Sequence, residues 1–474
     1  MSAGDRHWLS PGRPLDHRQS TWQQLRQAAA RFVRPLEPER EAALTRHWNS
    51  LDPNWRTPYQ AFGRKMTGCA ATIGLHPRCD FACTGCYLGE EANKIPPLPL
   101  AAVLQQLERI REWTGPKGNV QITDGEVTLR PIEELLAVLR RCHELQLIPM
   151  LMTHGDSLRR RDQLLARLCV EGGLTEISIH IDTTMRGRVG YKNATREEEL
   201  EPLRDEFAAM LRRVRRDTGS AIRAATTMTV TRENLDGLAH VAYWSALNRD
   251  VFKLLSLQPV ADVGRTSHEL RGVTPDECWQ RVAQGLAPFT DEVGAGGPIH
   301  VGHPDCNRVA SFLCIARSGR PARFVKTVRS DRDEDRAFLE AMHATGLMGV
   351  GYRGDPPLVG LARKLGAAAQ ALPFVAGRGQ RFLRARLRDA GETATGFLLG
   401  LLTGRVEVSG FTVVSHHFMG REEIGTATGQ ARLAACVFKL PVGDSMLSMC
   451  EVNLLGARAQ MYAAMRAENQ PISG

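Results

Sequence analysis

The stretch from residue 70 to 259 alternates short apolar runs with longer segments whose apolar residues recur at helical spacing. The apolar runs predict strands at 70–75, 120–123, 148–153, 177–182, 224–230 and 252–257. The segments between them predict helices at 100–114, 132–145, 158–170, 197–216 and 233–247. Strands alternating with helices in this way indicate a parallel sheet with right-handed crossovers. The regular repetition favours an α/β fold with a partial (β/α)6 barrel over an open doubly wound sheet.

The rest of the chain divides into a lead-in and a C-terminal part. Residues 1–65 predict a helical N-terminal extension, with the clearest helical pattern at 22–33. Residues 66–262 hold the predicted barrel, and residues 263–474 predict a C-terminal α+β domain with one helix near 275–287. A chain of 474 residues is long enough for such a division.

Polar or flexible residues follow the predicted end of every barrel strand. They are the cysteine loop around Cys83, then Asp124-Gly125-Glu126, Thr153-His154-Gly155-Asp156, His180 with Asp182, Thr226 to Thr231, and Gln258-Pro259. In barrels of parallel strands, the loops at the carboxyl ends carry the chemistry. The sequence therefore predicts one functional mouth at this end of the sheet.

Three cysteines lie in the first of these loops, in the stretch Cys79-Asp-Phe-Ala-Cys83-Thr-Gly-Cys86-Tyr87. Thiolate is the soft ligand that iron–sulfur clusters require, and three thiolates on one loop can hold three irons of a 4Fe–4S cluster. The fourth iron then has no protein ligand and stays open to a small molecule. The spacing therefore predicts a metal centre with redox or radical chemistry.

Other uses of these cysteines fit the spacing less well. A structural zinc site normally needs four ligands, and no fourth is nearby in the sequence. A disulfide would leave one cysteine over, and buried thiols rarely gather on a loop dense in Gly, Asp and Thr. The polar N-terminus has no apolar core of a secretory signal. We therefore predict a cytoplasmic protein whose eleven cysteines favour metal binding over disulfides.

The net charge of +9 comes mainly from arginine spread over many helices. Such arginines normally lie on solvated faces, and attraction to an anionic substrate, lipid headgroup or nucleic acid is the weaker interpretation. Aromatic residues make up only 6% of the chain, which argues against a dedicated nucleic-acid module. No apolar run approaches the ~20 residues of a membrane span. The longest, at 397–402, predicts a buried helix, with an interfacial helix as the alternative.

The cysteine motif, its tyrosine and the pair Gly125-Glu126 after the next strand resemble the radical S-adenosylmethionine (SAM) enzymes. The resemblance covers residues 68–262. It implies that the three cysteines ligate a 4Fe–4S cluster whose open iron chelates SAM. Reductive cleavage then gives methionine and a 5′-deoxyadenosyl radical, which abstracts hydrogen from the substrate. The resemblance also implies an electron donor such as a flavodoxin or ferredoxin.

The same resemblance implies which residues contact SAM. Tyr87 matches the residue whose backbone contacts the adenine, and Gly125-Glu126 matches the motif that meets the SAM ammonium. The usual motif of the family is Gly-Gly-Glu-Pro. Here Asp124 replaces the first Gly and Val127 replaces the Pro. The weaker candidates, on the fourth and fifth strands, are Ser178, His180, Thr227 and Thr229. For these four, ordinary strand polarity or a satisfied core hydrogen bond is the alternative.

A second, weaker resemblance lies in the C-terminal part. Its motifs are His303-Pro-Asp-Cys306, His416-His417-Phe-Met, Cys436-Val-Phe-Lys and Met-Cys450-Glu-Val-Asn453. Their order is similar to that in the branch of tetraether-lipid synthases and methanopterin-pathway methylases. That branch acts on unactivated C–H bonds, joining carbons or adding methyl groups. Several cysteine pairs of the branch are missing here.

Four C-terminal cysteines are enough to close one auxiliary 4Fe–4S cluster: Cys306, Cys314, Cys436 and Cys450. Buried apolar thiols are the alternative for two or more of them. The polar neighbours of Cys306 and the Met-Cys-Glu setting of Cys450 favour ligation. The remaining single cysteines are expected to be core or incidental thiols: Cys69, Cys142, Cys169 and Cys278.

We therefore predict a radical SAM enzyme acting on an unactivated C–H bond of a lipid or small molecule. A peptide-modifying maturase is the alternative within the superfamily, and it would be expected to have a denser cysteine domain. A non-catalytic iron–sulfur electron-transfer protein is the alternative from another class, but a carrier needs no SAM-binding loop. The sequence does not identify the substrate.

Overall fold

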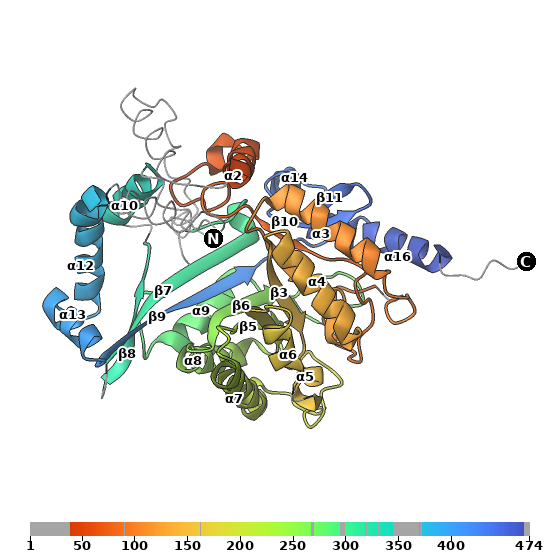
Figure 1. The fold of residues 1–474 in the computed structure, drawn as a ribbon, viewed down its shortest axis with the longest axis horizontal. Helices are drawn as coiled ribbons and strands as arrows, with labels where there is room; N and C mark the ends of the chain where they lie inside the picture. The colour runs from red at the N-terminus through yellow and green to blue at the C-terminus, as the bar shows by residue number, and fades with distance from the viewer. Residues whose placement is uncertain are drawn as a thin grey trace, which may run out of the picture. The chain divides into compact units, whose positions relative to one another are not determined.

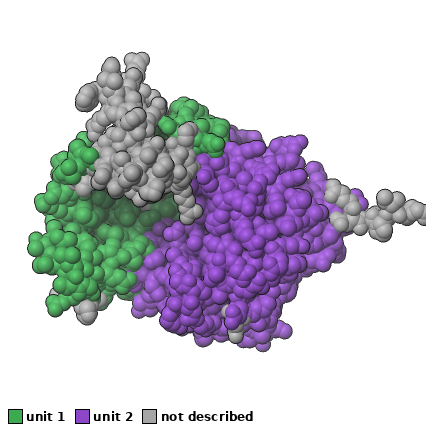
Figure 2. All heavy atoms as spheres, viewed as in Figure 1, with its two compact units in different colours: residues 1–67, 288–304, 308–410 green, residues 68–287, 305–307, 411–474 purple. Residues whose placement is uncertain are grey.

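The structure is a computed structural model that describes residues 38–468 except 90, 162, 267–269, 294–298, 318–319, 330–331, 345–368 and 370–371. The helical pattern expected at 22–33 lies outside the described residues. The chain divides into two compact units, which Figure 2 colours separately. Unit 1 comprises residues 1–67, 288–304 and 308–410, and unit 2 comprises residues 68–287, 305–307 and 411–474. Residues 263–287 and 411–474, which we assigned from sequence to the C-terminal domain, lie in the unit that contains the barrel.

A parallel sheet of six strands in sequence order is the centre of unit 2. The strands are β1 (Cys69–Ala71), β2 (Asn119–Ile122), β3 (Ile148–Thr153), β4 (Glu176–His180), β5 (Arg223–Val230) and β6 (Phe252–Pro259). All six lie where the apolar runs predict them. The first is shorter than predicted, because the backbone of Ile73 bonds the buried Gln106 side chain instead of a neighbouring strand.

Helices follow the strands and bury their apolar faces against the sheet in one large core. They are α3 (Leu100–Thr114), α4 (Ile132–Glu144), α5 (Asp156–Arg160), α6 (Leu164–Val170), α7 (Glu201–Thr218) and α8 (Leu238–Leu247), with short 3-10 turns at Val127–Leu129, Glu197–Leu200 and Leu235–Gly237. Figure 1 shows α3 and α4 side by side. The single helix predicted at 158–170 is two helices, because the chain leaves the helical conformation at Arg161 (φ −128°, ψ 85°).

Strands from the end of the chain lie at both edges of this sheet. β10 (Phe438–Val442) pairs in parallel with β1, and β11 (Ser445–Ser448) pairs antiparallel with β10. At the other edge, β9 (Val406–His416) pairs in parallel with β6. The order in unit 2 is therefore β11-β10-β1-β2-β3-β4-β5-β6-β9. The predicted α/β partial barrel is confirmed as a curled half-barrel sheet covered by helices.

Unit 2 also contains α9 (Pro275–Leu286), as predicted near 275–287, and three helices from the end of the chain. These are α14 (Ala427–Ala434), α15 (Met449–Leu454) and α16 (Ala457–Glu468). Unit 1 contains an antiparallel pair of strands, β7 (Asn307–Arg317) and β8 (Arg320–Lys326). Its helices are α2 (Pro38–Ser50), α10 (Asp333–Ala344), α12 (Gln380–Asp389) and α13 (Ala394–Leu402), with short turns at Pro53–Trp55 and Val375–Gly379.

The apolar run 397–402 forms α13, and the prediction of a buried helix is wrong. Phe397 packs against the small core of unit 1, and Gly400 is buried against Val406. The other side of the helix is exposed, up to 76% at Leu402, and it carries Leu398, Leu399, Leu401 and Leu402. Only one face of α13 is therefore packed. Within the described ranges, no helix is both long enough and apolar enough to cross a bilayer.

Candidate metal centre

The three cysteines of the loop after β1 come together, and all three are partly exposed. Cys83 lies within electrostatic range of both Cys79 and Cys86. Burial raises the pKa of Cys83 to about 12, and burial also raises the pKa of Cys79. Ligation of a metal by Cys79 and Cys83 must therefore release their protons.

Arg265, in the loop after β6, faces this cysteine triad. Its guanidinium interacts electrostatically with all three thiols and hydrogen-bonds Cys86. Burial alone would lower the pKa of Arg265, but the nearby thiols raise it. Arg265 is not among the predicted site residues, because nothing in the sequence marks one arginine among many as the one that reaches the loop. A half-buried cation beside three thiolates offsets their repulsion, which favours an anionic cluster.

The loop that carries Arg265 is fastened to the cysteine loop. The backbone N–H of Arg265 donates to the carbonyls of Cys86 (3.1 Å) and Leu88 (2.8 Å). The backbone N–H of Cys86 donates in turn to the hydroxyl of Thr266 (3.2 Å). A Cβ on Gly264 would lie 2.4 Å from the Tyr87 carbonyl, so this close approach requires glycine.

His154, after β3, ties the cysteine loop to the sheet. Its ring stacks on Phe81 with centroids 3.8 Å apart, and its Nε2 lies 2.8 Å from Asp80 Oδ1. The hydrogen bond from His154 is the main reason that the pKa of Asp80 is lowered. Ligand atoms of Cys79, Asp80 and His154 lie within 4.8 Å of one another. In the part of the chain that the structure describes, this is the one group of three such ligand atoms that lie so close together.

Gly125 and Glu126 form a turn after β2 that contacts the start of the cysteine loop. Gly125 has φ +85°, and a Cβ there would lie 2.1 Å from the carbonyl oxygen of His76. The backbone N–H of Glu126 donates to the carbonyl of Arg78 (2.8 Å). The turn is therefore held against the segment that leads into Cys79, and only glycine fits at its second position.

The carboxylate of Glu126 is 1% exposed and already has several partners. One oxygen accepts hydrogen bonds from Thr128 and from the hydroxyl of Thr153 (2.7 Å). The other accepts from the backbone N–H of His154 (2.8 Å). We predicted that Glu126 meets the SAM ammonium. In this structure its carboxylate joins the loops after β2 and β3.

The four polar residues predicted on β4 and β5 form two pairs. Ser178 and Thr227 are buried, with their hydroxyl oxygens 2.6 Å apart. Nearer the strand ends, His180 Nε2 lies 3.2 Å from the Thr229 hydroxyl and 2.9 Å from a carboxylate oxygen of Asp182. Burial would raise the pKa of Asp182, but His180 and the hydrogen bonds to the carboxylate lower it. Tyr87, the remaining predicted SAM contact, places its hydroxyl 3.2 Å from that of Thr123.

A second cysteine triad lies in unit 2 and comes from three separate segments. Cys306 ends a 3-10 turn at Pro304–Cys306, Cys436 precedes β10, and Cys450 lies in α15. Each of Cys436 and Cys450 interacts electrostatically with Cys306, and they interact with each other. Burial raises the pKa of all three thiols, that of Cys436 to about 12.

An arginine also faces this second triad. Arg432, in α14, is 2% exposed, and its Nε lies 3.5 Å from Cys306 Sγ. Its other nitrogens donate to Glu423 (2.8 Å) and to the carbonyl of His417 (2.7 Å). Burial would lower the pKa of Arg432, but Cys306 and its other anionic neighbours, Cys450 among them, raise it.

Cys314, the fourth cysteine expected at an auxiliary cluster, lies on β7 in unit 1. It is completely buried, and its thiol is 3.9 Å from the Phe312 carbonyl. Its surroundings are those of a core thiol. Three of the four single cysteines are buried in unit 2 as expected, namely Cys142, Cys169 and Cys278, whereas Cys69 is partly exposed. Burial lowers the pKa of His416, the last residue of β9, to about 4.

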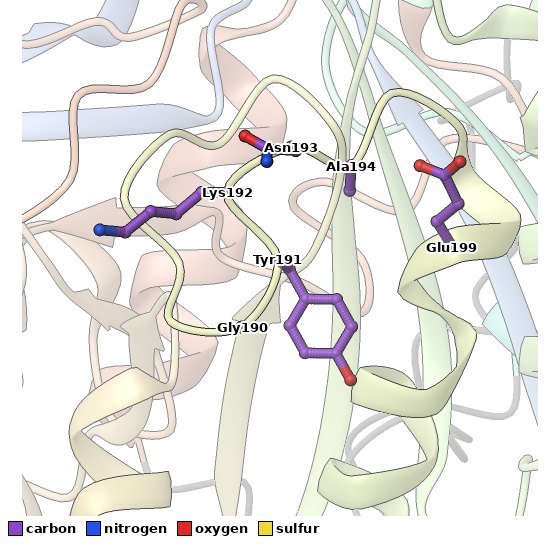
Figure 3. A pocket seen from close by; sticks show the side chains of 6 residues that line it. All are labelled: Gly190, Tyr191, Lys192, Asn193, Ala194 and Glu199. Carbon is purple, nitrogen blue, oxygen red and sulfur yellow. The ribbon is translucent and has the colours of Figure 1, made fainter.

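A surface hollow in unit 2 is formed by the segment that connects β4 to α7. It is lined by Gly190, Tyr191, Lys192, Asn193, Ala194 and Glu199 (Figure 3). None of the predicted SAM or metal residues lines it. The triads, rather than this hollow, define the candidate chemistry.

Comparison with known proteins identifies the domain that carries the first triad. Residues 73–240 match the family described as the radical SAM superfamily, so this part of the chain is a radical SAM domain. Among solved structures, that of a hexahistidine-tagged protein, anSMEcpe with bound AdoMet, is similar at 13% identity and a TM-score of 0.32. That likeness covers 46% of this chain and 57% of the other, so the chain spans little more than half of that protein. The comparison with curated proteins gives no significant match.

The residues present fit the cluster that a radical SAM domain implies. Cys79, Cys83 and Cys86 supply three neighbouring thiols, and Arg265 supplies a cation against them. Three thiolates leave one iron of a 4Fe–4S cluster without a protein ligand, which suits the chelation of a small molecule. The Gly125-Glu126 turn is held against the segment that leads into Cys79, the first of these thiols.

Proposed function

We propose that the chain is an enzyme that holds a 4Fe–4S cluster on Cys79, Cys83 and Cys86 and abstracts hydrogen from an unactivated C–H bond. When bound and reduced, the cluster supplies the electron that breaks a C–S bond of SAM and so provides the abstracting radical. The main support for the proposal is that the three thiols and Arg265 lie close enough to interact electrostatically within a radical SAM domain. We propose a lipid or other small molecule as the substrate, C–C bond formation or methylation as the outcome, and a flavodoxin or ferredoxin as the electron donor.

The residues around the triad have distinct roles in this proposal. Arg265 offsets the negative charge of the thiolates, and the stacked pair of Phe81 and His154 fixes the loop. The Gly125-Glu126 turn and the adenine-contacting backbone of Tyr87 position SAM. In this proposal His180 and Thr229, which pair near the ends of their strands, contact its ribose or carboxylate.

Anaerobic reconstitution with iron and sulfide, followed by reduction with SAM, tests this function. We expect 5′-deoxyadenosine, measured by liquid chromatography and mass spectrometry, to appear with the parent protein. Cys83→Ala should abolish it, whereas the matched control Cys142→Ala should not, because Cys142 is a core thiol of α4. Equal production by the Cys83→Ala protein would contradict the proposal.

The role of Glu126 is tested separately, by SAM affinity at fixed iron content. We expect Glu126→Gln to weaken SAM binding about 10- to 100-fold, because a charge-assisted hydrogen bond contributes ~1.5–3 kcal/mol. The amide keeps the shape of the side chain, so the iron content should stay near that of the parent. Unchanged affinity would remove Glu126 from the SAM site and leave it as a structural link between two loops.

We also propose that Cys306, Cys436 and Cys450 hold an auxiliary 4Fe–4S cluster. Support comes from the mutual interaction of the three thiols and from the buried Arg432 against two of them. Cys314 has no part in this proposal, since it packs in the core of unit 1.

The exposed leucines of α13 support a lipid over a peptide as the substrate class. An apolar helix face flanked by the basic helix α12 is the pattern of segments that lie at a membrane surface. Sedimentation with phosphatidylglycerol vesicles tests this, with Leu402→Glu as the variant and Leu247→Glu, another exposed leucine, as the control. Loss of binding in Leu402→Glu alone supports a lipid substrate. No vesicle binding by the parent protein would favour a water-soluble one.

A further inference from the structure

A buried carboxylate occupies the first position of the SAM-binding turn, where the family pattern has glycine. Asp124 is 1% exposed and has φ +100°, followed directly by Gly125 at φ +85°. A residue with a side chain rarely adopts a positive φ, and such a conformation persists only where the surroundings hold it. Asp124 must therefore be anchored by its partners.

The anchors of Asp124 come mainly from α16, more than 300 residues later in the chain. The hydroxyl of Tyr462 lies 3.1 and 3.0 Å from the two carboxylate oxygens. Arg458 donates to one oxygen, and the backbone N–H of Gly74 donates to the other. Arg458 and Tyr462 are 4% and 2% exposed, so the whole group is shielded from water.

Besides Asp124, Arg458 also contacts Tyr87, another residue of the proposed SAM site. Its guanidinium lies 4.9 Å from the centre of the Tyr87 ring, which follows the last cysteine of the first triad. Its Nε donates to Asn453 at the end of α15 (3.2 Å). Its Nη2 is buried without a hydrogen-bond partner among the described residues, so one donor beside Tyr87 is available to a ligand. One side chain thus connects the turn, the cysteine loop and the C-terminal helices.

We propose that Arg458 and Tyr462 are positioning residues for SAM, which act through Asp124 to hold the Gly125-Glu126 turn in its binding shape. This inference rests on the proposed function. Its physical basis is charge compensation: a buried carboxylate without its cation must take up a proton or move to water. Either change releases Asp124 from its strained conformation and lets the turn relax. The C-terminal helix α16 is therefore part of the SAM site, although it lies outside the matched radical SAM domain.

The experiment measures SAM affinity of the cluster-loaded protein by calorimetry, together with iron content and the change in the cluster's electron paramagnetic resonance spectrum on adding SAM. We expect Arg458→Gln to weaken SAM binding about 10- to 100-fold, as the loss of a hydrogen-bonded charge predicts. Arg458→Lys should keep part of the affinity, and Tyr462→Phe should lose less than Arg458→Gln. Arg466→Ala is the matched control, because Arg466 is an exposed arginine of the same helix paired with Glu91.

A second variant separates positioning from a general loss of stability. Asp124→Gly restores the double-glycine turn and removes the carboxylate that needs Arg458. We expect the Asp124→Gly, Arg458→Gln double variant to bind SAM more tightly than Arg458→Gln alone and to regain its spectral response. A double variant no better than Arg458→Gln, or an Arg458→Gln protein with the parent's affinity, would overturn the inference. A parent protein that binds iron but no SAM would overturn the proposed function instead.

Discussion

The two cysteine triads of this chain reach similar surroundings by different routes. Cys79, Cys83 and Cys86 lie within one loop, whereas Cys306, Cys436 and Cys450 come from three segments spread over the C-terminal part. Each triad is faced by a buried or half-buried arginine, Arg265 in one case and Arg432 in the other. In the first triad the covalent chain already brings the ligands together. In the second, only the folded structure brings the thiols together, so a cluster proposed there would bind only the folded chain.

The largest expected difference between the triads concerns SAM cleavage. Cys83→Ala should remove about four irons per chain and all 5′-deoxyadenosine production, because the SAM-binding cluster loses a ligand. Cys436→Ala should also remove about four irons per chain but leave SAM cleavage in place. Iron analysis and the deoxyadenosine assay, carried out on both variants, distinguish the role of the first triad from that of the second. A Cys436→Ala protein with full iron would mean that the second triad binds no cluster.

The arginines offer the next test, through the reduction potentials of the clusters. Arg265→Gln should lower the midpoint potential of the first cluster on the order of tens of millivolts, because a nearby cation stabilises the more negative reduced state. Arg432→Gln should lower only the midpoint potential of the second cluster. Redox titration followed by electron paramagnetic resonance checks both in one protein. Equal shifts of both clusters in either variant would contradict the pairing of each arginine with its own triad.

The raised thiol pKa values predict a smaller effect on the metal-free protein. The pKa values of Cys83 and Cys436 are raised to about 12, so each thiol favours the folded state below its unfolded pKa and loses that contribution as the pH rises toward 12. The free energy of unfolding should therefore fall above about pH 9, by up to ~1.4 kcal/mol per pH unit for each thiol. Denaturant unfolding of the metal-free protein at pH 8, 9 and 10 measures the slope. Cys83→Ala and Cys436→Ala should each reduce it.

The smallest expected effect comes from Cys314. Cys314→Ala should leave the iron content and SAM cleavage unchanged and cost about 1 kcal/mol of stability, as the loss of a small buried side chain does. Thermal unfolding and iron analysis are the measurements. Iron loss equal to that of Cys436→Ala would return Cys314 to the auxiliary site that the sequence suggests.

The sequence was informative wherever the signal is local. The strand and helix periodicities of 70–259 and the spacing of the first triad depend on neighbouring residues, and the structure has both where they were predicted. The surroundings of the triad depend on distant contacts instead. Arg265 is one arginine among many in the sequence, and the anchor of Asp124 lies in α16. Such pairings are set by packing and burial, which no short motif records.

The C-terminal strands show the same limit. β9 and β10 lie at the two edges of the barrel sheet, but their sequences carry no sign of which strand they will pair with. The prediction that the helix at 397–402 is buried was wrong for a related reason. An all-apolar run predicts burial on every side, whereas α13 packs only through Phe397 and Gly400.

The placement of β10 beside β1 has a consequence for how the protein is made. A ribosome synthesises β1 and the cysteine loop early, but the partner of the outer edge of β1 emerges some 370 residues later. Until then the strand that carries the cluster loop has an open edge, which is a site for mispairing with other chains. The SAM-binding half-barrel is therefore completed only after β10 has been synthesised. Chaperones and the iron–sulfur delivery machinery would meet this protein with its first metal-binding loop exposed on an unfinished sheet.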